Sequence, residues 1–188
     1  MKRCAWAMKT PRLQQYHDDE WGVPQYTDQG LFEILGFEIF QAGLSLDLVL
    51  QRRLTLQKAL VNFEIDQLAG FSEQQQRNFL TNPAVIRNQQ KLEAVIHNAR
   101  RWQAQQLHGF SPADQLWFLQ QQCHAYVDRL SVSTEDLFTE QTWQLFDSWG
   151  LVRVGPATVQ WFLRAAGFVN GHEANCDRFE NQMIGPYH

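Results

Sequence analysis

The chain has 188 residues, of which 44% are hydrophobic and 13% aromatic, enough to bury one substantial core in a single domain or two closely packed lobes. Its formal net charge of −4 at pH 7 weighs against a protein that coats nucleic acid, because affinity for phosphates comes largely from Lys and Arg. The charge does not exclude a protein that contacts a few phosphates through backbone N–H groups and a local basic surface. The pairs Arg52-Arg53 and Arg100-Arg101 are candidates for such a surface, although a solvated helix surface carries similar pairs.

Membrane and secreted classes are also disfavoured. No apolar stretch approaches the roughly 20 residues that a membrane span needs, and the start Met-Lys-Arg-Cys-Ala-Trp lacks the apolar segment of a signal peptide. Cys4, Cys123 and Cys176 are too few and too far apart for a disulfide framework, which favours thiol or metal-ligand roles. We therefore expect a cytoplasmic protein that is a monomer and has no membrane partner.

Helical periodicity dominates the first half of the chain. Thr27-Asp28 is a helix start signal, and the helix behind it is expected to be amphipathic. Five positions at spacings of three and four form its inward face: Leu31, Ile34, Leu35, Glu38 and Ala42. A second helix is expected over residues 46–60. Shorter helices are expected after Asp66 and after Ser72, the latter with Gln75 in capping-box spacing.

A long helix is expected next, ended by Gly109. Its apolar stripe is predicted to comprise Leu92, Val95, Ile96, Ala99 and Leu107. Ser111-Pro112 then supplies an N-cap followed by proline at the first helical position. No stretch alternates between apolar and polar residues for long enough to indicate a sheet, and no internal repeat is present. The sequence therefore predicts an all-α fold.

A helix, a short hairpin and a second helix are predicted over about residues 138–166. The first helix stops at Gly150, which can take a positive φ, and the second follows Pro156. Gly155 leaves the backbone open where the second helix presents unpaired N–H groups, and the helix dipole there favours an anion. Arg153 adds a charge beside that end. The hairpin is either a phosphate-binding site or a packing device between two helices, and its spacing does not decide between them.

Two pairs of potential metal ligands stand at opposite ends of the chain, Cys4 with His17 and His172 with Cys176. His172 and Cys176 share a face if their segment is helical, and a set of two thiolates and two imidazoles suits zinc. Four protein ligands leave no open position for water, so such a site would be structural and would tie the two termini together. The alternative is four unrelated side chains, since cysteine is often simply buried and a lone histidine is usually not a ligand.

Several motifs are long and unusual in composition. The most specific are Tyr16-His17-Asp18-x-Glu20-Trp21-Gly22-Val23-Pro24 and Gln41-Ala42-Gly43-Leu44-Ser45. The others are Arg3-Cys4-x-Trp6, Ile86-Arg87-Asn88-x-x-Lys91, Asn98-Ala99-Arg100 and Gly167-x-Val169-Asn170-x-His172-x-x-x-Cys176. Together they resemble the DNA-3-methyladenine glycosylase I family over essentially the whole chain.

The resemblance implies the helix-hairpin-helix glycosylase fold in a single domain spanning residues 1–188, acting on double-stranded DNA that contains alkylated bases. It implies a DNA-binding hairpin from Gly150 to Gly155, which includes Arg153, and a DNA wedge near Gly43 and Leu44. It implies one structural zinc ion with four ligands: Cys4, His17, His172 and Cys176. It also implies a base pocket formed by Trp6, Tyr16, Trp21 and Glu38.

Glu38 is the expected catalytic residue. Its place on an apolar helix face makes an unpaired carboxylate costly, so its partner is either a bound base or a buried N–H group or Arg. A cationic ring suits a carboxylate in a dry pocket, and aromatic walls bind such a ring through stacking and cation–π attraction. An N3-methylated adenine is already positively charged, so base flipping, recognition and attack by water are enough to release it. No lysine follows the hairpin where bifunctional relatives keep their nucleophile, which predicts a monofunctional enzyme that leaves an abasic site.

The sequence departs from the family pattern at two positions. Leu13 replaces an aromatic residue, and Leu46 replaces the tryptophan that normally follows the Gln-Ala-Gly-Leu-Ser motif. If both positions line the pocket, the loss of two rings weakens stacking by about 1 to 3 kcal/mol per base contact. This leaves open the usual activity with reduced discrimination, a shifted lesion preference, or a module that binds lesions in DNA without excising them. A zinc-stabilised interaction domain with no role on DNA is a further alternative.

Overall fold

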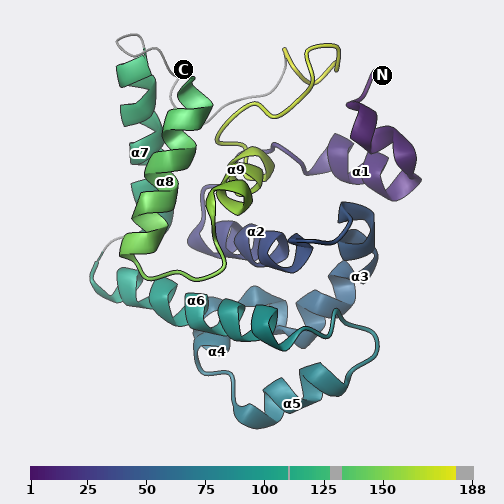
Figure 1. Cartoon of the computed structure of the whole chain (residues 1–188), viewed down its shortest axis with the longest axis vertical. Helices are drawn as coiled ribbons and strands as arrows, with labels where there is room; N and C mark the ends of the chain where they lie inside the picture. Colours follow the sequence, from purple (N-terminus) through teal and green to yellow (C-terminus); the bar gives the residue numbers. More distant parts are fainter. Residues whose placement is uncertain (110, 128–132, 181–188) are drawn as a thin grey trace.

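The computed structural model describes residues 1–109, 111–127 and 133–180, and within these ranges every regular element is a helix (Figure 1). The elements are a 3-10 turn at Ala5–Lys9, α1 at Pro11–Asp19, α2 at Asp28–Gln41, α3 at Leu46–Ala59, a 3-10 turn at Val61–Phe63, α4 at Ile65–Ala69, α5 at Glu73–Thr81, α6 at Gln89–Leu107, α7 at Pro112–Val127, α8 at Thr134–Ser148 and α9 at Pro156–Ala165. The predicted all-α fold is confirmed. None of the described helices is both long and apolar enough to cross a membrane.

The predicted start signals begin helices because side chains satisfy the free N–H groups of the first turn. Thr27 accepts a hydrogen bond from the N–H of Gly30 at the start of α2. Ser72 and Gln75 form the expected capping box at the start of α5, each side chain bonding the other residue's backbone N–H. These local signals locate α2 and α5 to the residue.

Three details of the predicted helices are wrong. The helix placed after Asp66 begins one residue before it, at Ile65. Ala42 is the exposed C-cap of α2 and does not belong to its inward face. Leu107 is 81% exposed, because the last turn of α6 extends past the core on which the helix packs. The segment of His172 and Cys176 consists of bends and turns, so the shared helix face that their spacing would allow is not what brings them together.

The core lies where α2, α6 and α8 meet. In Figure 1, α6 runs beneath α2, while α9 lies above α2, and the contacts between these helices agree with this view. Trp102 of α6 is fully buried, with its ring centroid 5.5 Å from Phe32 of α2, 6.2 Å from Phe146 of α8 and 5.7 Å from Trp149. Large aromatic side chains therefore join α2, the helix that carries Glu38, through α6 to α8, the helix before the hairpin.

Several polar side chains of α6 hold the hairpin between α8 and α9, and His97 Nε2 lies 2.9 Å from the carbonyl oxygen of Gly150. The amide of Asn98 accepts a hydrogen bond from the N–H of Val152 at 2.9 Å and donates one to its carbonyl at 3.0 Å. The guanidinium of Arg101 donates to the carbonyl of Trp149 at 2.8 Å. Asn98 itself is fully buried, and it bonds both backbone polar groups of a single hairpin residue. The hairpin is thus fixed to α6 by directional bonds.

We expect Asn98→Ala to lower the free energy of unfolding by about 1 to 3 kcal/mol, because it leaves the backbone polar groups of Val152 without their partner. Urea unfolding measures this change, and hydrogen exchange at the N–H of Val152 should accelerate. The matched control is Asn78→Ala on the exposed side of α5, which should change stability much less. Equal unfolding midpoints for the two variants would contradict the role given to Asn98.

Candidate active site and metal cluster

A cavity of about 380 Å³ brings together the residues that the sequence assigns to a base pocket. Its walls come from the first turn of the chain, α1, the loop after α1, α2, the start of α3, and α9. Six of the lining residues were singled out from the sequence: Trp6, Leu13, Tyr16, Trp21, Glu38 and Leu46. Leu13 and Leu46 therefore do face the same space as the aromatic residues, and their lack of rings changes the cavity wall directly.

The aromatic residues of the cavity contact one another edge to face. The Trp6 ring lies 5.1 Å from that of Trp21 at 76°, and 6.4 Å from that of Tyr16 at 57°. Trp21 is only 6% exposed. Such tilted contacts are the favoured geometry for aromatic pairs, and they hold the rings in fixed orientations. The inner wall of the cavity is therefore rigid.

Glu38 projects from α2 between the aromatic residues and is only 8% exposed. No hydrogen bond or ion pair joins its carboxyl group to any residue of the described ranges, so neither a backbone N–H nor an Arg supplies the partner there. Burial raises the pKa of Glu38 to about 8, because the charged form loses its hydration. A buried acid without a partner is the arrangement expected where a ligand completes the pairing.

Tyr16 stands beside Glu38, and both residues line two cavities. A second cavity of about 210 Å³ shares Tyr16, Glu38, Gln41 and Leu46 with the first. Burial, and then the charge of Glu38, raise the pKa of the Tyr16 phenol, which therefore stays protonated and able to donate a hydrogen bond.

Arg53 is one of the residues of the candidate basic surface. It lines the second cavity, where acidic and aromatic side chains contact it. Its guanidinium forms an ion pair with Glu20, lies 4.0 Å from Glu33, and sits 5.3 Å above the centre of the Phe37 ring. Two carboxylates therefore neutralise its charge. Arg52 donates to the carbonyl of Ala84. The pair Arg52-Arg53 contributes to packing and is not a free phosphate-binding surface.

The loop between α2 and α3 carries the predicted wedge. Gly43 takes a φ of +77° with open space around it, and Leu44 is 36% exposed at the end of this turn. Lys91, a residue that sequence reasoning quoted without giving it a role, fixes the loop from α6. Its ammonium group donates to the carbonyls of Phe40 and Ala42, both at 2.6 Å. The free carbonyls at the end of α2 are thereby satisfied, and the loop keeps one position.

The hairpin has the backbone conformation that its glycines predicted. Gly150 takes a φ of +75°, and a Cβ there would meet the Arg101 guanidinium at 2.6 Å. Arg153 also lies in the left-handed region, at +58°, and its side chain donates to Gln90. Gly155 is the N-cap of α9 without a side-chain cap, and nothing lies within 4 Å of where its Cβ would be. The N-terminus of α9 is therefore open, as an anion site requires.

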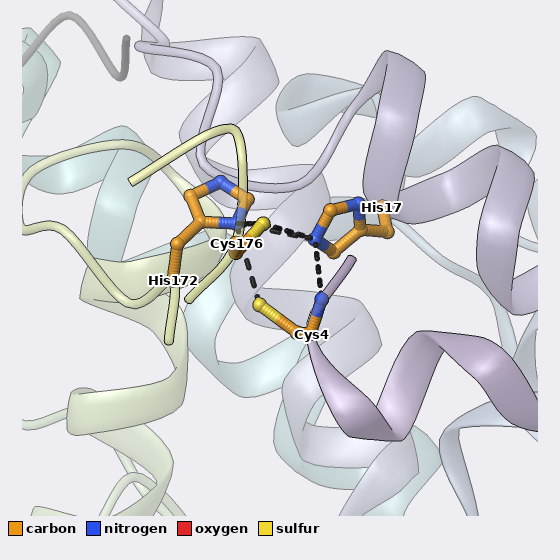
Figure 2. Close-up of side chains that lie close together, drawn as sticks. All are labelled: Cys4, His17, His172 and Cys176. Carbon is orange, nitrogen blue, oxygen red and sulfur yellow. Dashed lines mark hydrogen bonds between the residues drawn. The ribbon is translucent and has the colours of Figure 1, made fainter. Parts of the chain in front are cut away.

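The four predicted metal ligands converge in one buried cluster, as Figure 2 shows. His172 Nδ1 lies 3.2 Å from His17 Nε2 and 3.6 Å from Cys4 Sγ, while Cys176 Sγ lies 3.4 Å from His17 Nε2 and 3.7 Å from His172 Nδ1. All four ligand atoms lie within 4.8 Å of one another. The cluster, which unites the two ends of the described chain, can hold a metal ion.

Polar groups around the cluster prepare its ligand atoms. The Oδ1 atom of Asp18 lies 3.0 Å from His17 Nδ1, which places the ring proton on Nδ1 and leaves the Nε2 lone pair facing the cluster. Backbone N–H groups of Glu173 and Arg178 donate to Cys4 Sγ and Cys176 Sγ. Burial raises the pKa of the Cys4 thiol to about 11, so a thiolate at this position needs a cation beside it.

Trp161 also lines the larger cavity, although sequence reasoning assigned it no role. It lies on α9, more than 100 residues after the other aromatic residues of the cavity. The local pattern around it is that of an ordinary amphipathic helix, so no signal in the sequence identifies it. Only the tertiary packing of α9 against α2 brings it to the cavity.

Comparison with known proteins agrees with this arrangement. A family model described as methyladenine glycosylase matches residues 6–180. The chain is 29% identical to DNA-3-methyladenine glycosylase 1 of Escherichia coli (strain K12), over 94% of this chain and 96% of that protein. It is 30% identical to DNA-3-methyladenine glycosylase of Haemophilus influenzae, over 93% and 96%. A solved structure of 3-methyladenine DNA glycosylase I superposes with a TM-score of 0.80 and 31% identity, over 94% of this chain and 98% of that one.

The helical fold, matched over nearly its whole length by proteins of one enzymatic class, is that of a DNA glycosylase. The chain belongs to the methyladenine glycosylase family, whose model covers well over half of it. The family assignment made from the motifs is confirmed.

The raised pKa of Glu38 predicts a specific dependence of stability on pH. Between pH about 4.5 and about 8 the folded protein keeps a proton that the unfolded chain releases, so stability falls as pH rises through this window. Glu38→Gln removes the titration. Its unfolding free energy relative to the unmodified protein should therefore rise with pH, by up to about 1.4 kcal/mol per pH unit.

Urea unfolding between pH 5 and pH 8 at constant ionic strength measures this difference. Glu73→Gln is the control, because the side chain of Glu73 is 89% exposed, and its difference in unfolding free energy from the unmodified protein should stay nearly flat over this range. A flat difference for Glu38→Gln as well would show that Glu38 is ionised in the folded protein at neutral pH.

Proposed function

We propose that the protein is a monofunctional glycosylase that hydrolyses the N-glycosidic bond of an alkylated purine, foremost 3-methyladenine, in double-stranded DNA and leaves an abasic site. The observation that carries the proposal is the buried Glu38 carboxyl group, which has no partner in the described protein and faces an aromatic-walled cavity. The curated relatives from Escherichia coli and Haemophilus influenzae, both named as 3-methyladenine glycosylases, support this choice of base.

The geometry supports separate roles for the residues that hold the DNA strand and for those that bind the flipped base. The open N-terminus of α9 and Arg153 hold phosphates of the damaged strand, while Leu44, displayed on its fixed turn, fills the space that the flipped nucleotide leaves in the stack. The flipped base enters the cavity, where Glu38 becomes ionised and pairs with its positive charge. Tyr16 contributes a hydrogen-bond donor beside this carboxylate.

The glycosidic bond of such a base is weak because the bound base carries a positive charge, which it loses when the bond breaks and the base leaves as a neutral molecule. Catalysis therefore needs no strong acid. The enzyme has to hold the cationic base in a dry cavity and leave the sugar accessible to an attacking water molecule. Glu38 gives up its proton to solvent when the cationic base binds and takes one back once the base is neutral, so its protonation is restored over the reaction. Water supplies the hydroxyl group of the abasic sugar and releases one proton, and the electron pair of the broken bond stays with the base.

Base release tests this proposal. Duplex DNA methylated to contain 3-methyladenine is incubated with an excess of the protein, and the released base is measured by chromatography. We expect release by the unmodified protein and a rate reduced about 10- to 100-fold in Glu38→Gln, because a charge-assisted pairing of about 1.5 to 3 kcal/mol is lost.

The rival hypothesis is a module that binds lesions without excising them, and the observation that favours it is the absence of rings at Leu13 and Leu46 in the cavity wall. The same assay separates the two. If the unmodified protein releases no more base than Glu38→Ala does, yet still binds the methylated duplex, the result would contradict the glycosylase and support the binding module.

We propose further that the metal of the cluster is zinc, held by Cys4, His17, His172 and Cys176. A tetrahedral zinc ion with bonds of about 2.0 Å to nitrogen and 2.3 Å to sulfur separates its ligand atoms by about 3.3 to 3.8 Å. Four of the six separations between the ligand atoms are 3.2 to 3.7 Å, and all of them lie within 4.8 Å, so the donor set fits zinc in chemistry and is close to it in size. Because all four positions are filled by protein, the ion would stabilise the fold and take no part in the reaction.

Purification without chelator should give about one zinc ion per chain by elemental analysis. Cys176→Ser should lose the metal and melt at a lower temperature. Cys123→Ser is the matched control, because Cys123 is equally buried but lies outside the cluster, and it should keep the metal. A metal-free protein that melts at the same temperature as the metal-bound form would rule out a structural ion.

The remaining proposals concern the setting of the enzyme. We infer a single glycosylase domain over residues 1–188, because α2, α6, α8 and α9 share one core. We infer a cytoplasmic site of action, since the cluster needs reduced cysteines and the curated relatives are bacterial DNA glycosylases.

A further inference from the structure

Trp161 is the most exposed aromatic side chain on the wall of the larger cavity. It lines this cavity together with Glu38, yet 45% of its surface is accessible, compared with 6% for Trp21. A tryptophan this exposed leaves much apolar surface in water, which is unfavourable unless something covers it. Its position on the cavity wall indicates that a ligand of the cavity is what covers it.

The ring of Trp161 is oriented by its neighbours on one side. The guanidinium of Arg164, one turn later on α9, lies 5.5 Å from the ring centre. Arg164 is itself held by Glu135 of α8 at 2.7 Å. The ion pair of Arg164 and Glu135 has no net charge. It can therefore fix the Trp161 ring without repelling a cationic ligand on the opposite face of that ring.

The other rings of the cavity are already engaged. Trp6 meets Trp21 edge to face, and Trp21 in turn lies 4.7 Å from the ring of His172 at 83°. Leu13 and Leu46 offer no ring at all. Trp161 is therefore the cavity residue with the largest free aromatic surface, and it stands on the helix whose N-terminus faces the DNA in the proposed complex.

We propose that Trp161 stacks on the flipped alkylated purine and is a base-binding residue of this glycosylase. The aromatic surface missing at Leu13 and Leu46 is then supplied from α9, on the other side of the cavity. This inference rests on the proposed function, because it requires that an alkylated base occupies the cavity. It differs from that function in naming a residue whose removal weakens base recognition without altering the grip on the DNA strand.

Binding of the free base tests the proposal on the full-length protein. The dissociation constants for 3-methyladenine and for DNA containing an abasic site are measured separately for the unmodified protein, Trp161→Ala and Trp161→Phe. We expect Trp161→Ala to weaken 3-methyladenine binding about 5- to 100-fold, as the loss of one stacking ring predicts, and Trp161→Phe to weaken it less than about 3-fold. Binding to abasic-site DNA should change less than about 2-fold in both variants, since the base is absent there.

The control is Phe118→Ala, which removes a ring that is 62% exposed on α7 and lines none of the cavities described above. It should leave both constants unchanged. Unaltered 3-methyladenine binding by Trp161→Ala would overturn the role of Trp161 and leave the glycosylase proposal intact. Equal losses for the free base and for abasic-site DNA would also overturn it, by making Trp161 a strand contact. If the unmodified protein neither binds 3-methyladenine nor releases it from DNA, the proposed function fails and this inference fails with it.

Discussion

The buried Cys4, His17, His172 and Cys176 cluster is the constraint on which the rest of the site depends, because it supports the cavity wall from behind. The ring of His17 lies 5.4 Å from Trp6, and that of His172 lies 4.7 Å from Trp21, both edge to face. Two of the aromatic walls therefore rest directly on the metal-ligand set. A cluster that unites the two ends of the described chain thus fixes rings that come from a 16-residue stretch near its start. The same four side chains therefore contribute both to the stability of the fold and to the shape of the cavity.

The long helix α6 supplies the second constraint, by holding both loops that would meet DNA. Near its start, Lys91 bonds the end of α2 and so fixes the loop that carries Leu44. About two turns later, Asn98 bonds the hairpin at Val152. The spacing of seven residues places both side chains on the same face of the helix. Neither residue touches the cavity, yet together they set the distance between the proposed wedge and the proposed phosphate site.

The sequence predicts those features that depend on neighbouring residues or on long motifs. The capping box at Ser72 is a local device, and it appears as expected. The ligand set was predicted from chemistry and resemblance, although the turns around Cys176 are not the helix that its spacing from His172 allowed. Periodicity placed Leu107 in the core, because a periodic pattern does not show where a helix extends beyond the core on which it packs. Trp161 was missed for a related reason, since its place on the cavity wall is a property of how α9 packs and not of its own neighbours.

In the proposed reaction, charge and stacking have different effects on selectivity. Every base has a π face, so stacking on the rings of the cavity stabilises damaged and undamaged bases alike, and a cationic base adds a cation–π attraction. Glu38 distinguishes them, because a neutral adenine leaves the carboxyl group either protonated or unpaired, whereas a cationic base ionises it and pairs with it in a dry cavity. Replacing rings by Leu13 and Leu46 therefore lowers affinity for all bases together and preserves the preference for a charged one. A stacking surface on α9 can restore the lost affinity without a change at Glu38, and the two requirements can be met by different helices.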